Sequence, residues 1–176
     1  LLQTKKRKKI MSTVTFKGGK VNVEGQIPAV GTAAPDFTLV KSDLSEVSLK
    51  DLKGKTVILN IFPSIDTGVC AASVRHFNKD AASLTNTVVL AVSADLPFAA
   101  GRFCTTEGIE NVHPASVFRN PEFAKAYGLL MLDGPLKGLL ARTVVVINPE
   151  GKVSYTELVP EITEEPNYNA ALAAAK

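Results

Sequence analysis

Two apolar runs with a helical pattern between them constrain the fold of this chain most. Residues 56–62 and 87–92 are each almost continuous in apolar and β-branched side chains, which is typical of strands buried on both faces of a sheet. Between them, apolar residues recur at helical spacing over 69–84, with Val74 and Phe77 expected to face inward. Strand, helix and strand in this order predict a parallel βαβ unit and an α/β fold.

Further elements are expected on both sides of this unit. They are an N-terminal β-hairpin around Gly18-Gly19, short strands at 36–40 and 47–49, helices at 97–107 and 120–127, an antiparallel strand pair at 143–147 and 153–159, and a last helix at 166–176. Asn120 and Pro121 are expected to serve as the N-cap and the first residue of their helix. The whole order resembles the thioredoxin-like arrangement, in which helices flank a central mixed β-sheet.

The positive charge is concentrated at the start of the sequence. The 176 residues carry a formal net charge of +3, but residues 1–10 hold five basic residues and no acid, and the rest has 15 basic against 17 acidic residues. Met11 follows directly. We expect 1–10 to be a basic tail, added upstream of a single domain over 11–176. An arm for nucleic acid or a membrane surface is the alternative.

The domain itself offers no membrane or nucleic-acid signal. No apolar run approaches the roughly 20 residues that cross a bilayer, and the basic excess lies in the tail. The composition, with 45% hydrophobic and 21% charged residues, is that of an ordinary globular protein. We therefore expect no nucleic-acid or membrane partner for the domain.

Two cysteines are the first candidates for a chemical role. Cys70 and Cys104 stand 34 positions apart, so the C-x-x-C dithiol motif is absent. Together with His76 and His113 they show none of the short paired spacings of a zinc site. Cys70 falls in the first turn of a predicted helix, where unsatisfied backbone N–H groups favour the nucleophilic thiolate. From position alone, an inert buried cysteine is an equally good reading.

The residues before Cys70 favour reactivity. Pro63 to Cys70 reads P-x-x-x-T-x-x-C, the signature of the peroxiredoxins, and the sequence resembles them closely here. Thr67 stands three residues before Cys70, so a turn can bring its hydroxyl beside the sulfur. A hydroxyl can accept a hydrogen bond from a peroxide and donate one to a thiolate. Pro63 can shape the turn and keep bulk water away from the sulfur.

Longer stretches carry a finer resemblance. Residues 59–75, 93–104 and 133–142 are similar to the bacterial thiol peroxidase family, the atypical two-Cys peroxiredoxins, and the similarity runs from about Met11 to the C-terminus. It implies the thioredoxin-like peroxiredoxin fold, with Cys70 as the peroxidatic cysteine, Cys104 as the resolving cysteine and Arg142 as the catalytic arginine. It also implies hydroperoxide substrates, an intramolecular Cys70–Cys104 disulfide, thioredoxin as reductant and a homodimer. It implies no metal, haem or flavin.

The residues around Arg142 support its assignment independently. Arg142 precedes a run of β-branched residues, so it stands at the end of a strand, where a guanidinium can stabilise a thiolate and hold a peroxide oxygen. A surface arginine at a strand end is the alternative. The remaining candidates receive structural roles. They are His76 on the far side of its helix, His113 in a loop, Arg102 and Arg119 on the surface, and Phe62, Phe98 and Phe103 in the core.

The expected function is therefore that of a thiol-specific peroxidase in antioxidant defence. It would reduce hydrogen peroxide and organic hydroperoxides through a cysteine sulfenic acid. A thiol cycle of this kind suits a reducing cytoplasm. Two other classes remain open: a general thiol–disulfide exchanger on the same fold, and a binding protein that uses the basic tail while both cysteines are inert.

Overall fold

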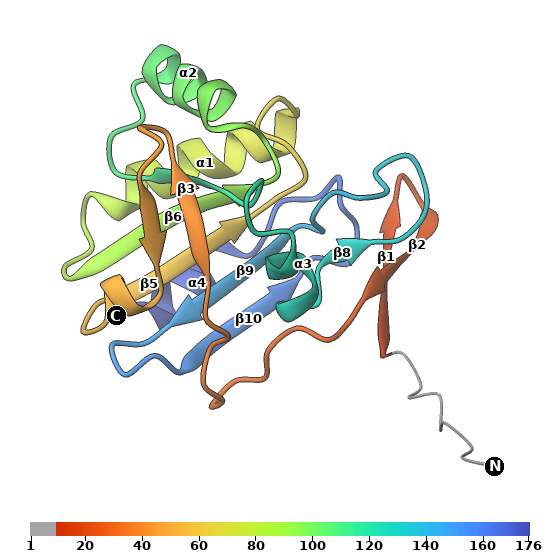
Figure 1. Ribbon diagram of the computed structural model, residues 1–176, viewed down its shortest axis with the longest axis horizontal. Coiled ribbons are helices and arrows are strands. Elements are labelled where there is room, and N and C mark those ends of the chain that lie inside the picture. Colours follow the sequence, from red (N-terminus) through yellow and green to blue (C-terminus); the bar gives the residue numbers. More distant parts are fainter. Residues whose placement is uncertain (1–9) are drawn as a thin grey trace.

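A seven-stranded mixed sheet runs through the computed structural model, which describes residues 10–176 (Figure 1). Its strand order is β10-β9-β5-β6-β7-β3-β4. The strands are β3 Thr38–Lys41, β4 Glu46–Ser48, β5 Thr56–Ile61, β6 Thr87–Ser93, β7 His113–Ser116, β9 Thr143–Ile147 and β10 Val153–Leu158. The three central strands β5, β6 and β7 are parallel, and their outer neighbours pair antiparallel.

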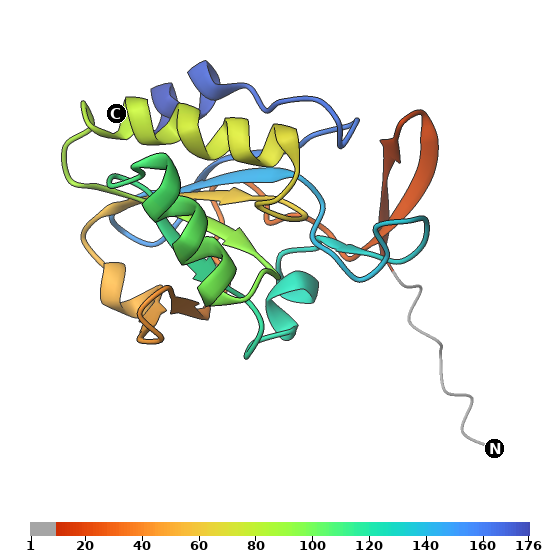
Figure 2. The same cartoon turned by 90° about the horizontal axis from the view of Figure 1, so that it is seen from above.

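Helices cover both faces of this sheet (Figure 2). They are α1 Gly68–Ala81, α2 Pro97–Glu107, α3 Glu122–Ala126, α4 Tyr168–Ala174 and the short 3₁₀ helix η1 Lys50–Leu52. Successive β5 residues point to opposite faces. Ile58 packs in one buried cluster with residues of α1 and α4, and Leu59 packs in another with residues of α3 and η1. Within residues 10–176, no helix combines the length and apolar character that crossing a bilayer requires.

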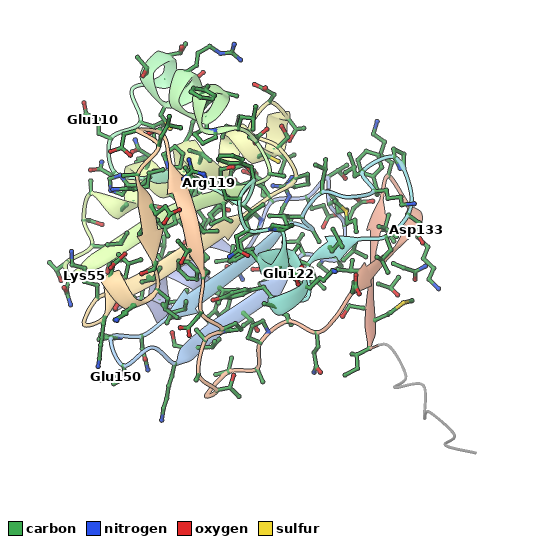
Figure 3. The ribbon with its side chains drawn as sticks, viewed as in Figure 1. Lys55, Glu110, Arg119, Glu122, Asp133 and Glu150 are labelled. Atoms are coloured by element: carbon green, nitrogen blue, oxygen red, sulfur yellow. The ribbon has the colours of Figure 1, made fainter. Side chains whose placement is uncertain are left out.

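A second, three-stranded sheet lies beside the first, in the order β1-β2-β8. It is formed by the hairpin of β1 Met11–Phe16 and β2 Gly19–Glu24, with β8 Leu130–Met131. Lys17 and Gly18 connect the hairpin, and both have positive φ, as a two-residue type I′ turn requires. Asp133, labelled in Figure 3, accepts hydrogen bonds from N and Nδ2 of Asn22 (2.9 and 2.7 Å). This ties the loop before β9 to the small sheet.

The small sheet also holds the segment after β10. The Thr15 N–H donates to the Pro160 carbonyl, and the Thr15 carbonyl accepts from the Ile162 N–H. The Glu161 carboxylate accepts from the backbone N–H groups of Gly18 and Thr163 (2.8 and 2.9 Å). These hydrogen bonds to the charged form lower the pKa of Glu161 to about 2. Residues 160–163 are therefore fixed in place.

The main sequence expectations for the fold are confirmed. The central mixed sheet, the flanking helices on both faces, the βαβ unit and the N-terminal hairpin are all present. Of the expected tail over residues 1–10, all but Ile10 lies outside the described residues.

Three local expectations were wrong. His113 begins strand β7 instead of lying in a loop. The proline after it does not break the strand, because β3 pairs with β7 only at Ala115 and Ser116. Pro114 pairs with β6 alone, so its missing N–H costs no hydrogen bond to β3. Asn120 is not an N-cap, since its Nδ2 donates to the Thr38 carbonyl (3.4 Å) and the helix begins after Pro121.

The third concerns the core. Phe62 is buried and Phe103 packs against the cluster around α1 as expected, but Phe98 is 67% exposed. It lies in the first turn of α2, next to Leu96, which is 53% exposed. The expectation for Phe98 failed because hydrophobicity alone does not reveal which face of a short helix meets the sheet. Arg102 and Arg119 are exposed, as expected.

Candidate active site

Cys70 lies fully buried in the first turn of α1, at the end of the loop that follows β5. Its thiol is free, and its neighbours in the core include Phe62, Ile65 and Val74. Because α1 begins at Gly68, Cys70 is the third residue of the helix, where the unpaired N–H groups of a helix start favour a negative charge. The expected placement of Cys70 at a helix N-terminus is confirmed.

Arg142 reaches this sulfur from the neighbouring strand. Strands β5 and β9 pair antiparallel, with Ile61 opposite Thr143, so the start of β9 meets the end of β5. Arg142 is only 2% exposed. Its Nη2 lies 3.3 Å from Sγ of Cys70, and its Nε donates to the Ile162 carbonyl (2.9 Å). The alternative of a surface arginine is therefore wrong.

Two groups of the described chain contact this guanidinium, the Cys70 sulfur and the Ile162 carbonyl. Among residues 10–176, no carboxylate forms an ion pair with Arg142. A buried cation is strongly destabilising unless it is paired or hydrogen-bonded, and the Cys70 sulfur is one of the two groups that Arg142 contacts. Nη1 of Arg142 is buried and has no hydrogen-bond partner within the described part of the chain. One N–H donor group is thus available beside the sulfur.

The loop before Cys70 is held by an acidic residue that the sequence analysis did not single out. Asp95, just after β6, accepts hydrogen bonds from the Ser64 hydroxyl (2.8 Å), the Ile65 N–H (2.7 Å) and the Ser93 hydroxyl (2.7 Å). An acidic residue two positions after a buried strand was the available signal, because the ends of parallel strands meet at one edge of the sheet. Asp95 therefore fixes the loop between β5 and α1.

Pro63 and Thr67 both lie in this loop. Pro63 is buried. Thr67 is exposed, and its hydroxyl donates to the Ser64 carbonyl (2.9 Å). The donor of Thr67 is thus engaged within the loop, and the lone pairs of its oxygen remain available to accept.

Helix α4 packs against α1, and its Tyr168 lies in the same buried cluster as Cys70. The ring of Tyr168 stacks on His76 (3.7 Å between centroids) and meets the edge of Phe77 (5.2 Å). Its hydroxyl donates to Glu165 (2.9 Å). Burial raises the pKa of Tyr168, and the hydrogen bond to Glu165 raises it further. His76 pairs with Asp80 (3.0 Å) on α1 and is occupied in holding α4.

Cys104 occupies a contrasting environment on α2. It is half-buried and free, and it lines a cavity of about 620 Å³ between α2, the β3–β4 turn and the start of β7. Its carbonyl accepts from the N–H groups of Gly108 and Ile109, so it sits in the last turn of the helix, where negative charge is disfavoured. Burial raises the pKa of the Cys104 thiol to about 11. Cys104 is therefore protonated at neutral pH.

Helices α1 and α2, which carry Cys70 and Cys104, contact each other through side chains. Nε of Arg75 on α1 lies 2.8 Å from a carboxylate oxygen of Glu107 on α2, and the Arg75 guanidinium lies over the Phe103 ring. Both thiols are free in this structure.

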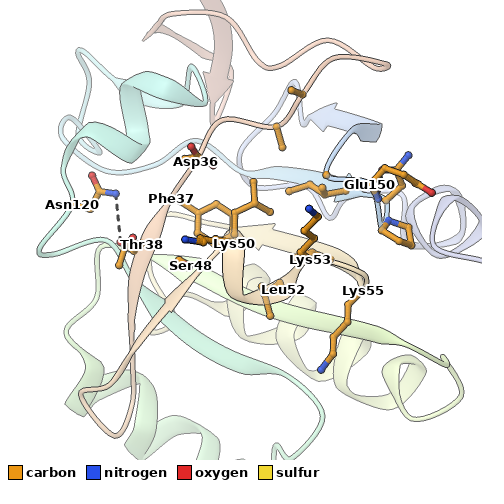
Figure 4. Close-up of a pocket in the computed structure, with 18 residues that line it drawn as sticks. Asp36, Phe37, Thr38, Ser48, Lys50, Leu52, Lys53, Lys55, Asn120 and Glu150 are labelled. Atoms are coloured by element: carbon orange, nitrogen blue, oxygen red, sulfur yellow. Dashed lines mark hydrogen bonds between the residues drawn. The ribbon is translucent and has the colours of Figure 1, made fainter.

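A second cavity, of about 690 Å³, lies at the opposite end of the sheet (Figure 4). It is lined by Lys55 and Val57 at the start of β5 and by Ile147 at the end of β9, with Lys50 and Lys53 beside them. Neither cysteine lines it. This cavity is therefore separate from the Cys70–Arg142 site.

Comparison with known proteins places the chain in a family. The family model described as Redoxin matches residues 29–172, which include Cys70, Cys104 and Arg142. The chain therefore belongs to the redoxin family.

Within this family, the chain is similar to bacterial thiol peroxidases over nearly its whole length. A thiol peroxidase of Corynebacterium glutamicum is 56% identical over 164 residues, which span 93% of this chain and 99% of the relative. A thiol peroxidase of Mycobacterium tuberculosis is also 56% identical, over 93% of this chain and 98% of its own length.

A solved structure of a peroxiredoxin-like protein from Aquifex aeolicus superposes with a TM-score of 0.88 at 43% identity, covering 94% of this chain and 96% of the other. The thiol peroxidase from Chromobacterium violaceum shares the fold with a TM-score of 0.82, at 20% identity and coverages of 92% and 93%. The expected thioredoxin-like peroxiredoxin fold is thus confirmed.

The raised pKa of Cys104 predicts how its rate of alkylation depends on pH. In a Cys70→Ser variant, we expect alkylation of Cys104 by iodoacetamide to accelerate about tenfold per pH unit from pH 8 to 10, because only the thiolate reacts and its pKa is about 11. An ordinary thiol levels off above pH 9. The measurement is the labelling rate by mass spectrometry, with the urea-unfolded variant as control. A plateau near pH 9 in the folded protein would contradict the assignment.

Proposed function

We propose that this redoxin reduces hydroperoxides with the Cys70 thiolate, held by Arg142. The class of activity, a thiol-dependent peroxidase of the peroxiredoxin type, is confirmed by the thiol peroxidases that match nearly the whole chain at 56% identity. The assignment of residues is carried by one observation, the 3.3 Å contact between Nη2 of buried Arg142 and Sγ of buried Cys70. A cation and a helix N-terminus converge on one sulfur, which is the environment of a reactive cysteine.

In the first step, the Cys70 thiolate attacks the terminal oxygen of the hydroperoxide. The O–O bond breaks, the sulfur is oxidised to a sulfenic acid, and the other oxygen leaves as water or an alcohol after taking a proton. Nη1 of Arg142, which has no partner within residues 10–176, would donate to the peroxide and stabilise the charge on the leaving oxygen. Thr67 would accept from the peroxide O–H, and Pro63 would exclude water.

In the second step, we assign Cys104 as the resolving cysteine, as in an atypical two-Cys peroxiredoxin. Its thiol attacks the Cys70 sulfenic acid, an intramolecular disulfide forms, and one water is released. A disulfide requires Cα atoms within about 7 Å, yet Cys70 is fully buried on α1 and Cys104 faces a cavity on α2. Helices α1 and α2 would therefore shift or partly unwind in each cycle, the first turn of α1 included.

Reduction of the disulfide by two electrons from a dithiol would complete the cycle. We propose thioredoxin as this reductant and the reducing cytoplasm as the compartment, where such a thiol cycle can turn over. The product of the cycle is removal of peroxide, that is, antioxidant defence.

The exposed apolar residues at the start of α2 support a homodimer. Leu96 and Phe98 are 53% and 67% exposed. Phe118, which is 43% exposed, lies at the same end of the sheet, because the Ser116 hydroxyl donates to the Asp95 carbonyl (2.6 Å). Large apolar side chains grouped at one end of a molecule mark an interaction site. A second copy of the chain is the proposed occupant.

The cysteine roles are tested by two variants. We expect Cys70→Ser to abolish thioredoxin-dependent peroxide turnover, whereas Cys104→Ser should still consume one equivalent of peroxide and form a sulfenic acid without an internal disulfide. Dimedone labelling and non-reducing mass spectrometry measure the two products. Normal turnover in Cys70→Ser would overturn the assignment. Faster exchange with a disulfide substrate than with peroxide would instead identify a general thiol–disulfide exchanger.

The dimer face is tested by a polar substitution. We expect Phe98→Ser to shift the protein from dimer to monomer in sedimentation equilibrium, because it removes the most exposed apolar side chain of the proposed face. Val30→Ser is the matched control, because Val30 is 61% exposed in the loop between β2 and β3, and it should leave the dimer intact. A wild-type protein that is monomeric at micromolar concentration, or a dimer unaffected by Phe98→Ser, would contradict this face.

A further inference from the structure

A buried polar pair connects the centre of the sheet to the turn that carries Cys70. Asn60 interrupts an otherwise apolar run in β5 and is fully buried. Its Nδ2 donates to Oγ of Ser73 (3.1 Å), which is also fully buried, on α1. The Ser73 hydroxyl in turn donates to the carbonyl of Cys70 (2.8 Å). Strand β5 is thus linked by two hydrogen bonds to the backbone of Cys70.

This pair is poorly explained by stability alone. Oδ1 of Asn60 is buried without a hydrogen-bond partner among the described residues. A buried acceptor without a partner destabilises the folded state, and an apolar side chain would avoid this. A serine that bonds to the carbonyl three residues earlier also weakens a helix slightly. Polar groups kept at such a cost in a core call for an explanation beyond packing.

The position of the pair suggests that explanation. Asn60 faces the same side of the sheet as Ile58 and Phe62, which pack around Cys70, and it lies opposite Val144, two residues from Arg142. The pair therefore holds the backbone of the first turn of α1 from the side of strand β5, while Arg142 contacts the sulfur.

We propose that Asn60 and Ser73 are positioning residues that hold the first turn of α1 folded and thereby decide the fate of the Cys70 sulfenic acid. This inference rests on the proposed function, because it concerns the step after the first oxidation. Nδ2 of Asn60 orients the Ser73 hydroxyl, and the hydroxyl holds the Cys70 carbonyl. While both bonds persist, the turn stays helical and Cys70 stays beside Arg142.

The sulfenic acid has two competing fates. If the turn unwinds, the Cys104 thiol attacks it, the S–S bond forms and water leaves. If the turn stays folded, a second hydroperoxide oxidises the sulfenic acid to a sulfinic acid and is itself reduced to water or an alcohol. The first route completes the cycle and the second inactivates the enzyme. The Asn60–Ser73 pair would favour the folded turn, and so would slow the first route.

The test compares Ser73→Ala and Asn60→Leu with the wild-type protein. In both variants, we expect a higher peroxide concentration to be needed for half-maximal formation of sulfinic acid per turnover. The expected increase is about fivefold, because losing one net hydrogen bond shifts the equilibrium between the folded and the unwound turn by about that factor. The rate of Cys70 oxidation by peroxide should fall at the same time, because the thiolate is held less firmly. Sulfinic acid is measured by mass spectrometry during turnover with thioredoxin.

Tyr127→Phe is the matched control. It removes another buried hydrogen bond, from the Tyr127 hydroxyl to the Pro35 carbonyl (2.7 Å), in the cluster on the opposite face of the sheet. It should lower stability without changing the partition between disulfide and sulfinic acid.

A partition shift in Ser73→Ala no larger than in Tyr127→Phe would overturn the proposal, as would greater sensitivity to sulfinic acid formation. Ser73→Ala is the milder change and keeps the test decisive if Asn60→Leu does not fold. Failure of the proposed function itself is distinguishable, because the wild-type protein would then form no sulfenic acid.

Discussion

The buried contact between Arg142 and Cys70 is the interaction on which the rest of the site depends. A guanidinium that is 2% exposed and has no carboxylate partner among residues 10–176 requires compensation. The Cys70 sulfur at the start of α1 and the Ile162 carbonyl are the groups that contact it. The antiparallel register of β5 and β9 brings Arg142 and Cys70 together, although they are 72 positions apart in the sequence. The orientation of the guanidinium is then set by the Ile162 carbonyl.

This dependence gives the N-terminal hairpin a role in the site. Thr15 bonds on both sides of Glu161, and the Glu161 carboxylate accepts from Gly18 and Thr163. The hairpin therefore holds the backbone that presents the Ile162 carbonyl to Arg142. Asp95 also fixes the loop before Cys70, and Tyr168 packs against α1. Each of these contacts restricts a different element, and together they keep a reactive group buried and oriented.

Much of the fold followed from the sequence because its signals are local. The apolar strands β5 and β6 and the turn residues of the hairpin are determined by side chains close in sequence. Cys70 at a helix start was expected from the strand–helix pattern, and Arg142 at a strand end from the β-branched run after it. The roles of Pro63, Thr67 and Cys104 rest on the resemblance and stay predictions. What could not be predicted depends on tertiary context. The exposure of Phe98 depends on how α2 meets the sheet, and the Ile162 carbonyl has no side-chain signal. Asn60 did carry a signal, as the polar residue in an apolar strand.

The rate at which peroxide oxidises Cys70 in a single turnover of an Arg142→Lys variant tests the central claim most directly. Lysine keeps the positive charge but loses the planar fork that contacts the Ile162 carbonyl and the sulfur together. Losing one preorganised donor of this kind costs about 100-fold in rate. We expect a fall of that order, with the far-UV circular dichroism unchanged and with Arg119→Lys, on the surface, at the wild-type rate. A folded Arg142→Lys protein that reacts as fast as the wild type would contradict the claim.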